Sequence, residues 1–453
     1  MARAGTACSA STASGGRAES AARGSRCPPA LPPRHPPFTR HPLSAARRCR
    51  IFLLVISLLV ISRFETRGFS QMTSADSFAT RLDRHLDRVT RRRGELGAPQ
   101  VAVRAPGLGI DYRFGDADAR FHVASVGKLA TATLIAQLVE RRALAFATPV
   151  AELLPRDELA GLFETTPATD AAGGASVDQL LSHTAGVADY FDGPVASGSR
   201  MRDLVVDDPD RFWSPAELLA FSRERQRPIG RPGERFRYSD TGFVLLGRIV
   251  EEATGQAFHE ALHERIFRPA GMLDSALLFH SVPERDRATS AADGDPADGR
   301  GSTTSAAAPP RTAIAPLRLG RVEASRFTSL SCDWAGGGIV STPDDLLAFS
   351  RALHDGTLVA PATLAHLAEP RNRFRPGLRY GAGMMQVRFG GFSPFLAGLP
   401  RPTGHVGVLA THVFHDPAHD ADIVLNFAST REMRRSFMTL IEIERALQQV
   451  ARA

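Results

Sequence analysis

Strand-like segments occur near both ends of the chain, whereas helix-like and loop segments fill the middle. Such distant segments share a core most simply by joining one sheet. The sequence therefore predicts an α/β (α+β) fold: one sheet from the two chain ends, flanked by helices that include 74–93 and the carboxyl end, with a helical lobe over about 125–367. The strand-like runs are PQVAVRAP (99–106), GIDYRF (109–114), YGAGMMQVRFG (380–390), HVGVLATHVFHD (405–416) and ADIVLNFAS (421–429).

The first 71 residues differ in composition from the rest of the chain. They are rich in Arg, Ala and Pro and predict a disordered tail, 1–71. Within it, 51–62 (IFLLVISLLVIS) is an apolar run that is short for a membrane span. We expect the native protein to start at Met72, with 72–453 as the folded domain. That start slightly favours a cytoplasmic location, whereas a genuine tail would mean an N-terminal membrane anchor or export.

Charge and cysteine content exclude several function classes. The net charge is +7, but 1–71 carries +9, which leaves −2 for the remainder and no nucleic-acid footprint. Cys332 is the only cysteine after the tail, so the body has no internal disulfide. The sequence has neither a CxxC pattern nor a Gly-rich phosphate loop. We therefore expect no cofactor, no nucleic-acid partner, and membrane contact only if 51–62 is an anchor.

Lys128 is the only lysine in a chain whose other 54 basic residues are arginine. Arginine stays charged at any ordinary pH, whereas a buried lysine can lose its proton. Ser125 stands three residues earlier, and on a helix this spacing places the hydroxyl and the amine on one face. An amine beside a hydroxyl can activate it as a nucleophile, and Lys128 also begins the stripe that should face the core. A chance pairing of the two residues is the alternative.

Two further segments contain candidate site residues. Tyr238 lies between a Gly/Pro-rich turn and a helix-like segment, where its phenol can point into a cleft; a half-buried structural aromatic is the alternative. In GHVG (404–407), His405 and Gly407 stand at the start of a strand. Gly407 would let a substrate lie against the strand backbone, and a structural role is the alternative for His405.

The segment HEALH (259–263) matches the H-E-x-x-H pattern of zinc hydrolases. On a helix, His259 and His263 would share a face, with Glu260 as general base. A catalytic zinc needs a third protein ligand, and no later segment offers one clearly. We therefore favour a surface helix with an apolar stripe, and we predict no metal at this segment.

Taken together, the other segments resemble the serine β-lactamase and penicillin-binding-protein superfamily, and most closely its β-lactamase-related esterases and D-peptidases. The family order S-x-x-K, Y-x-N and K-T-G or H-x-G appears as SVGK (125–128), YSD (238–240) and HVG (405–407). Two accessory phrases also match, LLSHTAGV (180–187) and GGGIVSTPDDLLAFSRAL (336–353). The resemblance covers roughly 75–453 and implies an antiparallel sheet with a helical lobe and the site between them.

The resemblance also implies roles for individual residues. Ser125 is similar to the acylated nucleophile, and Lys128 to the amine that takes and returns its proton. Tyr238 looks like the second base, acting as a phenolate or through the lysine. Gly407 and Val408 fall on the strand that borders the substrate, and the N–H groups of Ser125 and Val408 would form the oxyanion hole.

Two departures from the family pattern affect the expected chemistry. Asp240 replaces the family's Asn, and a carboxylate there would favour the charged form of Lys128, which would then lower the pKa of Tyr238. Val406 replaces a hydroxyl residue, and His405 replaces a permanent cation. Both changes weaken the grip on a β-lactam carboxylate, so β-lactam hydrolysis is disfavoured.

The function predicted from the sequence is a serine hydrolase that cleaves a small ester, amide or peptide through an acyl-enzyme. A non-catalytic relative that binds a peptide or acyl ligand is one alternative, and a D-Ala carboxypeptidase-type cell-wall enzyme is another. The stretch 281–318 is rich in Ser, Ala, Pro and Asp, and we expect it to be flexible and to shape substrate choice. The acyl group, the leaving group and the oligomeric state are not predicted.

Overall fold

The computed structural model describes residues 75–164, 174–292 and 312–453. The predicted tail 1–71, its apolar run 51–62 and the proposed start at Met72 all lie outside the described residues. Within the described ranges, no helix combines the length and the apolar character needed to cross a membrane.

The main sheet has eight antiparallel strands in the order β2-β1-β13-β12-β11-β10-β9-β8. Its centre joins the two ends of the chain, since Val101 of β1 pairs with Leu425 of β13. This confirms the predicted fold class. The strands are β1 Gln100–Ala105, β2 Ile110–Phe114, β8 Asn372–Arg375, β9 Leu378–Tyr380, β10 Met385–Val387, β11 Thr403–Gly407, β12 Thr411–Asp416 and β13 Ala421–Asn426.

The run 405–416 differs from its prediction, because it contains parts of two strands rather than one. β11 and β12 form a hairpin whose turn includes Ala410 at φ +59°. The predicted run 380–390 likewise holds the end of β9 and all of β10. Neither turn contains an Asn-Gly or Pro-Gly dipeptide, which commonly marks a turn in a sequence. Each run therefore looked like one strand.

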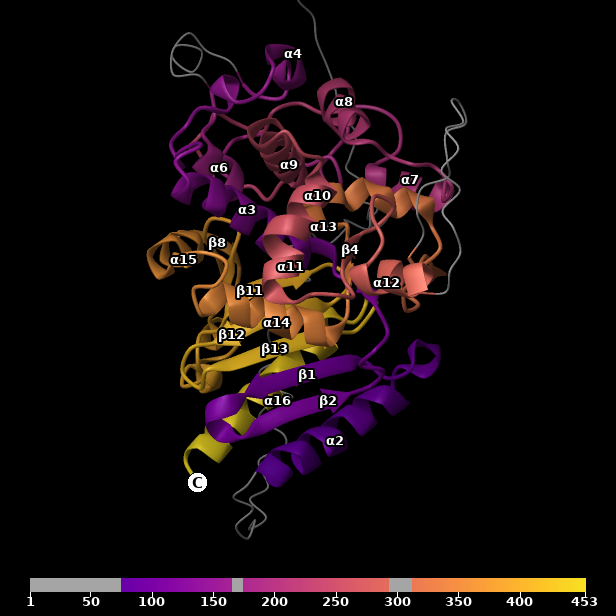
Figure 1. Cartoon of the computed structure of the whole chain (residues 1–453), viewed down its shortest axis with the longest axis vertical. Coiled ribbons are helices and arrows are strands. Elements are labelled where there is room, and N and C mark those ends of the chain that lie inside the picture. Colours follow the sequence, from indigo (N-terminus) through magenta and orange to yellow (C-terminus); the bar gives the residue numbers. More distant parts are fainter. Residues whose placement is uncertain (1–74, 165–173, 293–311) are drawn as a thin grey trace, which may run out of the picture. The chain divides into compact units, whose positions relative to one another are not determined.

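The sheet separates two hydrophobic cores. On one face lie α2 (Ala75–Arg91) and α16 (Met433–Ala451), which pack against each other and against side chains such as Val103 and Ile423. On the other face lie α14 (Pro343–His354) and the helical part of the chain, which pack on side chains such as Ala102. Figure 1 shows α14 crossing β12, β13 and β1. Side chains alternate between faces along each strand, so each central strand contributes to both cores.

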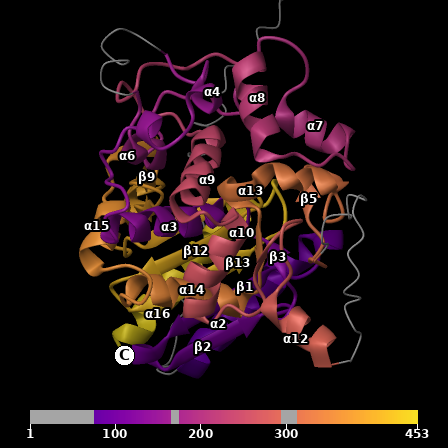
Figure 2. The ribbon, with the colours of Figure 1, turned by 45° about the horizontal axis from the view of Figure 1, so that its top comes forward.

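The helices of the second face surround α3 (Lys128–Glu140), which lies between the sheet and α9 (Asp240–Thr254) in Figure 2. Every residue of α3 from Lys128 to Leu138 is buried. The predicted single core-facing stripe was therefore too narrow, because α3 is a central helix covered on all sides. The remaining α-helices are α4 Arg156–Leu159, α6 Val177–Leu181, α7 Met201–Asp207, α8 Pro215–Arg225, α10 Phe258–Leu262, α11 Arg268–Ala270, α12 Glu284–Ala292, α13 Trp334–Gly337 and α15 Pro361–Ala368.

Smaller elements connect these parts. The π-helix is η5 His263–Phe267, and the 3-10 helices are η1 Gly94–Leu96, η2 Pro106–Leu108, η3 Ala124–Gly127, η4 Val150–Glu152, η6 Thr328–Asp333, η7 Phe389–Gly391 and η8 Pro394–Leu396. Two small sheets consist of β3 Phe121–His122, β7 Ile339–Ser341 and β4 Ala276–Leu277, and of β5 Arg318–Leu319 and β6 Val322–Glu323.

The stretch predicted to be flexible, 281–318, is structured in part. It contains α12, and Asp286 of that helix accepts hydrogen bonds from Arg120 at 2.9 and 2.6 Å. Residues 293–311 lie outside the described residues. The biased composition of this stretch did not indicate a helix. The helix is held by Arg120, which is distant in sequence, so the local pattern could not predict it.

Candidate active site

Ser125 lies on η3, the 3-10 turn that joins β3 to α3. The residue before it, Ala124, has φ +50°, a left-handed conformation that costs energy for a residue with a Cβ. The backbone N–H of Ala124 donates to Nδ1 of the buried His122 at 3.1 Å. This bond ties the strained turn to His122 at the end of β3.

Gly337 of the GGG phrase and Gly127 of the nucleophile turn allow the two segments to approach closely. A Cβ at Gly337 would lie 2.6 Å from the carbonyl oxygen of Ala124, and a Cβ at Gly127 would lie 3.0 Å from Cα of Gly337. The first contact is closer than real Cβ atoms come, so position 337 needs glycine, and the second is tight. The accessory phrase 336–353 therefore contributes backbone to the site, a role that the sequence did not reveal.

Lys128 is fully buried at the start of α3, and its Nζ has three partners. It donates to the carbonyl oxygen of Gly336 at 2.6 Å, forms a short ion pair with Oδ1 of Asp240, and lies 3.4 Å from Oγ of Ser125. Asp240 is the first residue of α9, where the positive end of the helix dipole favours a carboxylate. The amine and hydroxyl paired in the sequence are thus neighbours in space.

Tyr238 precedes α9, and its hydroxyl is buried in the same cluster although part of its ring is exposed. Nζ of Lys128 lies 5.2 Å from the centre of the Tyr238 ring. Burial, and then the charge of Asp240, raise the pKa of the Tyr238 phenol well above its usual value, and the Ser125 hydroxyl only partly offsets this rise. The expectation that Lys128 lowers this pKa is not supported, because Asp240 neutralises the lysine; the resting phenol is protonated.

The ring of His183, from the accessory phrase 180–187, packs against the ring of Tyr238. Its ring lies 4.2 Å from the Tyr238 ring, centre to centre, and its Nδ1 accepts the backbone N–H of Ser239 at 3.2 Å. Burial and then the nearby Lys128 keep the pKa of His183 well below its usual value, so the ring is neutral. Nothing in the sequence assigned His183 a role of its own; its place inside a family-like phrase was the available signal.

Asp189 orients the start of α9. Its Oδ1 accepts the backbone N–H of Asp240 at 3.1 Å. Burial, reinforced by the negative charge of Asp240, raises the pKa of Asp189 to about 7. Asp189 thus positions Asp240 without adding a full second negative charge at neutral pH, and no motif in the sequence indicated it.

The strand β11 runs beside the nucleophile turn and places alternate side chains on opposite faces. His405 faces the site and is completely buried. Its Nδ1 donates to the carbonyl oxygen of Val406 at 2.9 Å and its Nε2 accepts from the hydroxyl of Tyr380 at 3.3 Å. Burial and then Lys128 lower the pKa of His405 to about 3, so this side chain is neutral at pH 7.

The structure adds packing contacts for the other residues of this strand end. A Cβ at Gly407 would lie 2.8 Å from the carbonyl oxygen of Val123, so the close approach of the nucleophile turn requires glycine here, and a contact of Gly407 with substrate stays a prediction. The Val406 side chain packs in the core on the opposite face of the sheet. A hydroxyl residue at this position would therefore not face the site. Val408 follows the strand and is partly exposed, at 45%; the oxyanion hole formed by its N–H and that of Ser125 stays a prediction.

The HEALH segment lies on a helix with an apolar stripe, the interpretation favoured from the sequence. Phe258, Leu262 and Ile266 are almost fully buried. His263 pairs with Glu284 at 3.2 Å, and neither histidine of the segment belongs to a cluster of potential metal ligands among the described residues.

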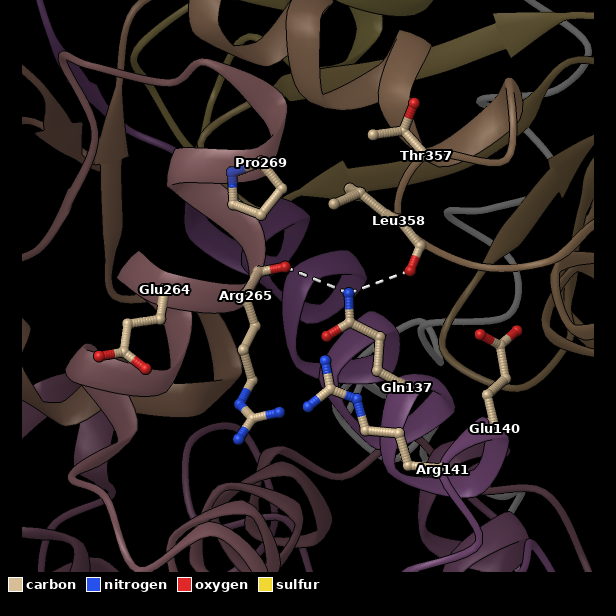
Figure 3. A pocket seen from close by; sticks show the side chains of 8 residues that line it. All are labelled: Gln137, Glu140, Arg141, Glu264, Arg265, Pro269, Thr357 and Leu358. Atoms are coloured by element: carbon tan, nitrogen blue, oxygen red, sulfur yellow. Dashed lines mark hydrogen bonds between the residues drawn. The ribbon is translucent and has the colours of Figure 1, made fainter.

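A cavity of about 230 Å³ opens at the far end of α3 (Figure 3). Gln137 lies at its centre, and its Nε2 donates to the carbonyl oxygens of Arg265 and Leu358 at 3.1 and 3.0 Å. The α3 residues that line the cavity lie roughly 13–20 Å along the helix from Lys128, because each residue rises about 1.5 Å. It is therefore separate from the site around Ser125, although α3 connects the two.

Comparison with known proteins agrees with this geometry. A family model described as Beta-lactamase matches residues 109–447. The chain belongs to the β-lactamase family. The resemblance seen in the sequence motifs is thereby confirmed.

Two curated relatives and one solved structure illustrate the family. Penicillin-binding protein 4 of Amycolatopsis lactamdurans is 32% identical over 164 residues, which cover 36% of this chain and only 37% of the relative. Esterase EstB of Burkholderia gladioli is 29% identical over 321 residues, 65% of this chain and 74% of the esterase. The D-amino acid amidase of Ochrobactrum anthropi SV3, solved with L-phenylalanine, has a TM-score of 0.63 at 22% identity and covers 83% of this chain and 100% of its own. These names support a hydrolytic enzyme, and the last similarity shows the shared fold.

Proposed function

We propose that this protein is a serine hydrolase that cleaves small esters or amides through an acyl-enzyme on Ser125. The observation that supports it most directly is the position of Lys128: its Nζ is fully buried, paired with Asp240 and 3.4 Å from Oγ of Ser125. Relatives named as an esterase and as a D-amino acid amidase support this range of substrates.

The contacts suggest a proton path for acylation. Oγ of Ser125 gives its proton to Nζ of Lys128 as Lys128 passes one to Asp240, and the serine oxygen attacks the substrate carbonyl carbon. The bond from that carbon to the leaving group then breaks, and the leaving group takes its proton from the hydroxyl of Tyr238. The Lys128–Asp240 pair reprotonates Tyr238, and water repeats the sequence to release the acid. A protonated Tyr238 suits this role as an acid.

The charges around the site favour uncharged acyl substrates. His405 is neutral and already bonded to Tyr380, so it offers no cation to a substrate carboxylate. Asp240 adds a negative charge where a neutral amide is usual in the family. We therefore expect esters and amides without a carboxylate to be better substrates than β-lactams.

A fluorophosphonate probe tests the nucleophile directly. We expect the wild type to be labelled and Ser125→Ala to lose both labelling and turnover of p-nitrophenyl esters. Ser325→Ala, which changes a serine outside the site, should keep both. Labelling that persists in Ser125→Ala would contradict the assignment. An unlabelled wild type that still binds peptides would support the non-catalytic alternative.

A substrate panel then separates the remaining alternatives. Small p-nitrophenyl esters and D-amino acid amides should be cleaved, whereas peptides ending in D-Ala-D-Ala carry a carboxylate and should be poor substrates. Preferential release of D-Ala from such peptides would favour the cell-wall carboxypeptidase instead.

A further inference from the structure

A second cluster of buried polar side chains lies on the other side of the sheet, away from Ser125. Asp416 ends β12, His419 lies in the turn between β12 and β13, and Glu444 belongs to α16. One ligand atom from each residue lies within 4.8 Å of the other two. Asp416 and Glu444 are fully buried, and the His419 side chain is 9% exposed.

The cluster lacks a partner for one of its carboxyl groups. Both oxygens of Glu444 are buried and make no standard hydrogen bond within the described residues. Oδ2 of Asp416 is in short contact with Nδ1 of His419, and Oδ1 accepts the backbone N–H of Ala418 at 2.9 Å. Burying a carboxyl group without a partner is costly, so the site needs a cation or a bound proton.

The charges around the cluster support the same view. The carboxyl group of Asp416 is the acid that faces Glu444, close enough for the two to share a proton, and no Arg or Lys side chain of the described residues balances them. A second cluster differs: Asp422, near His415 and His354, already has Arg351 at 2.7 Å and the hydroxyl of Ser350 at 2.7 Å. Of the two clusters, within the described residues, the Glu444 cluster alone leaves both oxygens of a buried carboxyl group without a hydrogen-bond donor.

We propose that Asp416, His419 and Glu444 bind one divalent transition-metal ion, with Zn²⁺ as the best match. Two carboxylate oxygens and one imidazole nitrogen suit Zn²⁺, whereas Mg²⁺ and Ca²⁺ prefer more oxygen ligands. Zn²⁺ binds such atoms at about 2.0–2.2 Å in a tetrahedron, which spaces the ligand atoms roughly 3.3–3.6 Å apart. The three groups would therefore close in on the ion, while the short Asp416–His419 contact opens to admit it. The ion neutralises both carboxylates.

The bound ion would be structural rather than catalytic. Asp416 lies five residues along β12 from Thr411, whose hydroxyl donates to the carbonyl oxygen of Val123 near the nucleophile turn at 2.8 Å. Five strand residues span roughly 16 Å, so the ion lies too far away to touch a substrate at Ser125. It would instead clamp α16 to the turn between β12 and β13.

Metal titration of the EDTA-treated, tag-free full chain tests the proposal. We expect one equivalent of Zn²⁺ by calorimetry, and Tm to rise by roughly 3–4 °C at a free Zn²⁺ concentration a hundred times the Kd. Glu444→Gln and His419→Ala should lose both effects. Glu442→Gln, two residues away on α16 and outside the cluster, should keep them.

Co²⁺ provides a test that needs no variant. We expect visible absorption bands typical of mixed nitrogen and oxygen ligands when Co²⁺ is added to the wild type, and Zn²⁺ should remove them. Ester hydrolysis should continue in EDTA, because the ion lies outside the active site. Absence of stoichiometric Zn²⁺ binding to the wild type, equal binding by Glu444→Gln, or a larger Tm rise with Mg²⁺ than with Zn²⁺ would overturn the proposal; the first result would mean that Glu444 holds a proton instead.

Discussion

The two faces of the main sheet each carry a buried charged cluster, and the clusters differ in how their charges are balanced. On the face of α3, the cation of Lys128 meets the carboxylate of Asp240 and the carbonyl oxygen of Gly336. On the face of α16, the oxygens of Glu444 face another acid, Asp416, and have no hydrogen-bond donor among the described residues. The charges of the first cluster are balanced by groups of the chain itself. In our proposal, the charges of the second cluster are balanced by a bound metal ion.

This difference suggests different uses. A balanced pair can exchange a proton at little cost because its net charge does not change, which suits a reaction that moves protons. Two buried carboxyl groups without a counter-charge are electrostatically unfavourable. A bound cation removes that penalty, so such a pair suits cation binding. The variants below test whether the two clusters can be told apart in this way.

The largest effect is expected from Lys128. Lys128→Arg keeps the charge but cannot release a proton, and Lys128→Ala removes both, so each should lower kcat/KM at least ~1000-fold. Lys128→Ala should also destabilise the fold by about 3–5 kcal/mol, because Asp240 is left uncompensated in a largely buried place. Ester kinetics and urea unfolding measure both. Arg141→Lys, at the exposed end of α3, is the control, and an active Lys128→Arg enzyme would contradict the proposed proton path.

Tyr238 should have the next largest effect. Tyr238→Phe removes the proposed acid while it retains the ring that packs on His183, so we expect kcat to fall roughly 100-fold with KM little changed. The fall should be smaller for esters with good leaving groups, which need less proton donation. Tyr380→Phe provides a matched control, since its hydroxyl bonds to His405 rather than to the nucleophile. Equal losses in both variants would point to a packing role.

Asp240→Asn should lower kcat/KM and also change the pH profile. The proposed path passes a proton to the Asp240 carboxylate, which an amide cannot accept. Asp240 also raises the pKa of Tyr238, so removing its negative charge lowers that pKa. The alkaline-side fall in kcat/KM, where Tyr238 loses the proton that it donates, should therefore move to lower pH. A pH–rate series on one ester measures both effects. A folded variant with the wild-type rate would contradict the proton path through the carboxylate, and an unchanged profile would show that Asp240 does not act on Tyr238.

The smallest effect concerns acid stability, in which both faces should behave alike. Burial lowers the pKa of His412, beside α16, to about 3, as it does for His405 on the other face. The unfolded chain binds a proton at each histidine below about pH 6.5, so stability is present above that pH and is lost as the pH falls toward 3. The slope should be about 1.4 kcal/mol per pH unit per histidine. His412→Gln should reduce it in urea unfolding at pH 4–7; an unchanged slope would mean that His412 is protonated when folded.

Local patterns in the sequence were enough for the class of fold and for the residues that meet at Ser125. Alternating and β-branched runs at both ends predict the strands, because the period of a strand is visible within a few residues. Lys128 was conspicuous because an otherwise arginine-only chain keeps a residue that can lose a proton. The motifs SVGK, YSD and HVG were enough to single out Ser125, Tyr238 and His405, because each motif is a short local pattern that can be read without the fold.

What depends on distant parts of the chain became visible only in the tertiary structure. The protonated state of Tyr238 follows from burial in the assembled core, and the neutral state of His405 and the glycine requirement at Gly407 follow from burial and from neighbours over a hundred residues away. Glu444 looks in the sequence like an ordinary charged residue of an amphipathic helix. The sequence alone determined which elements form and which motifs carry the chemistry; packing decided which charges are balanced, because burial and charge pairing are properties of the assembled core.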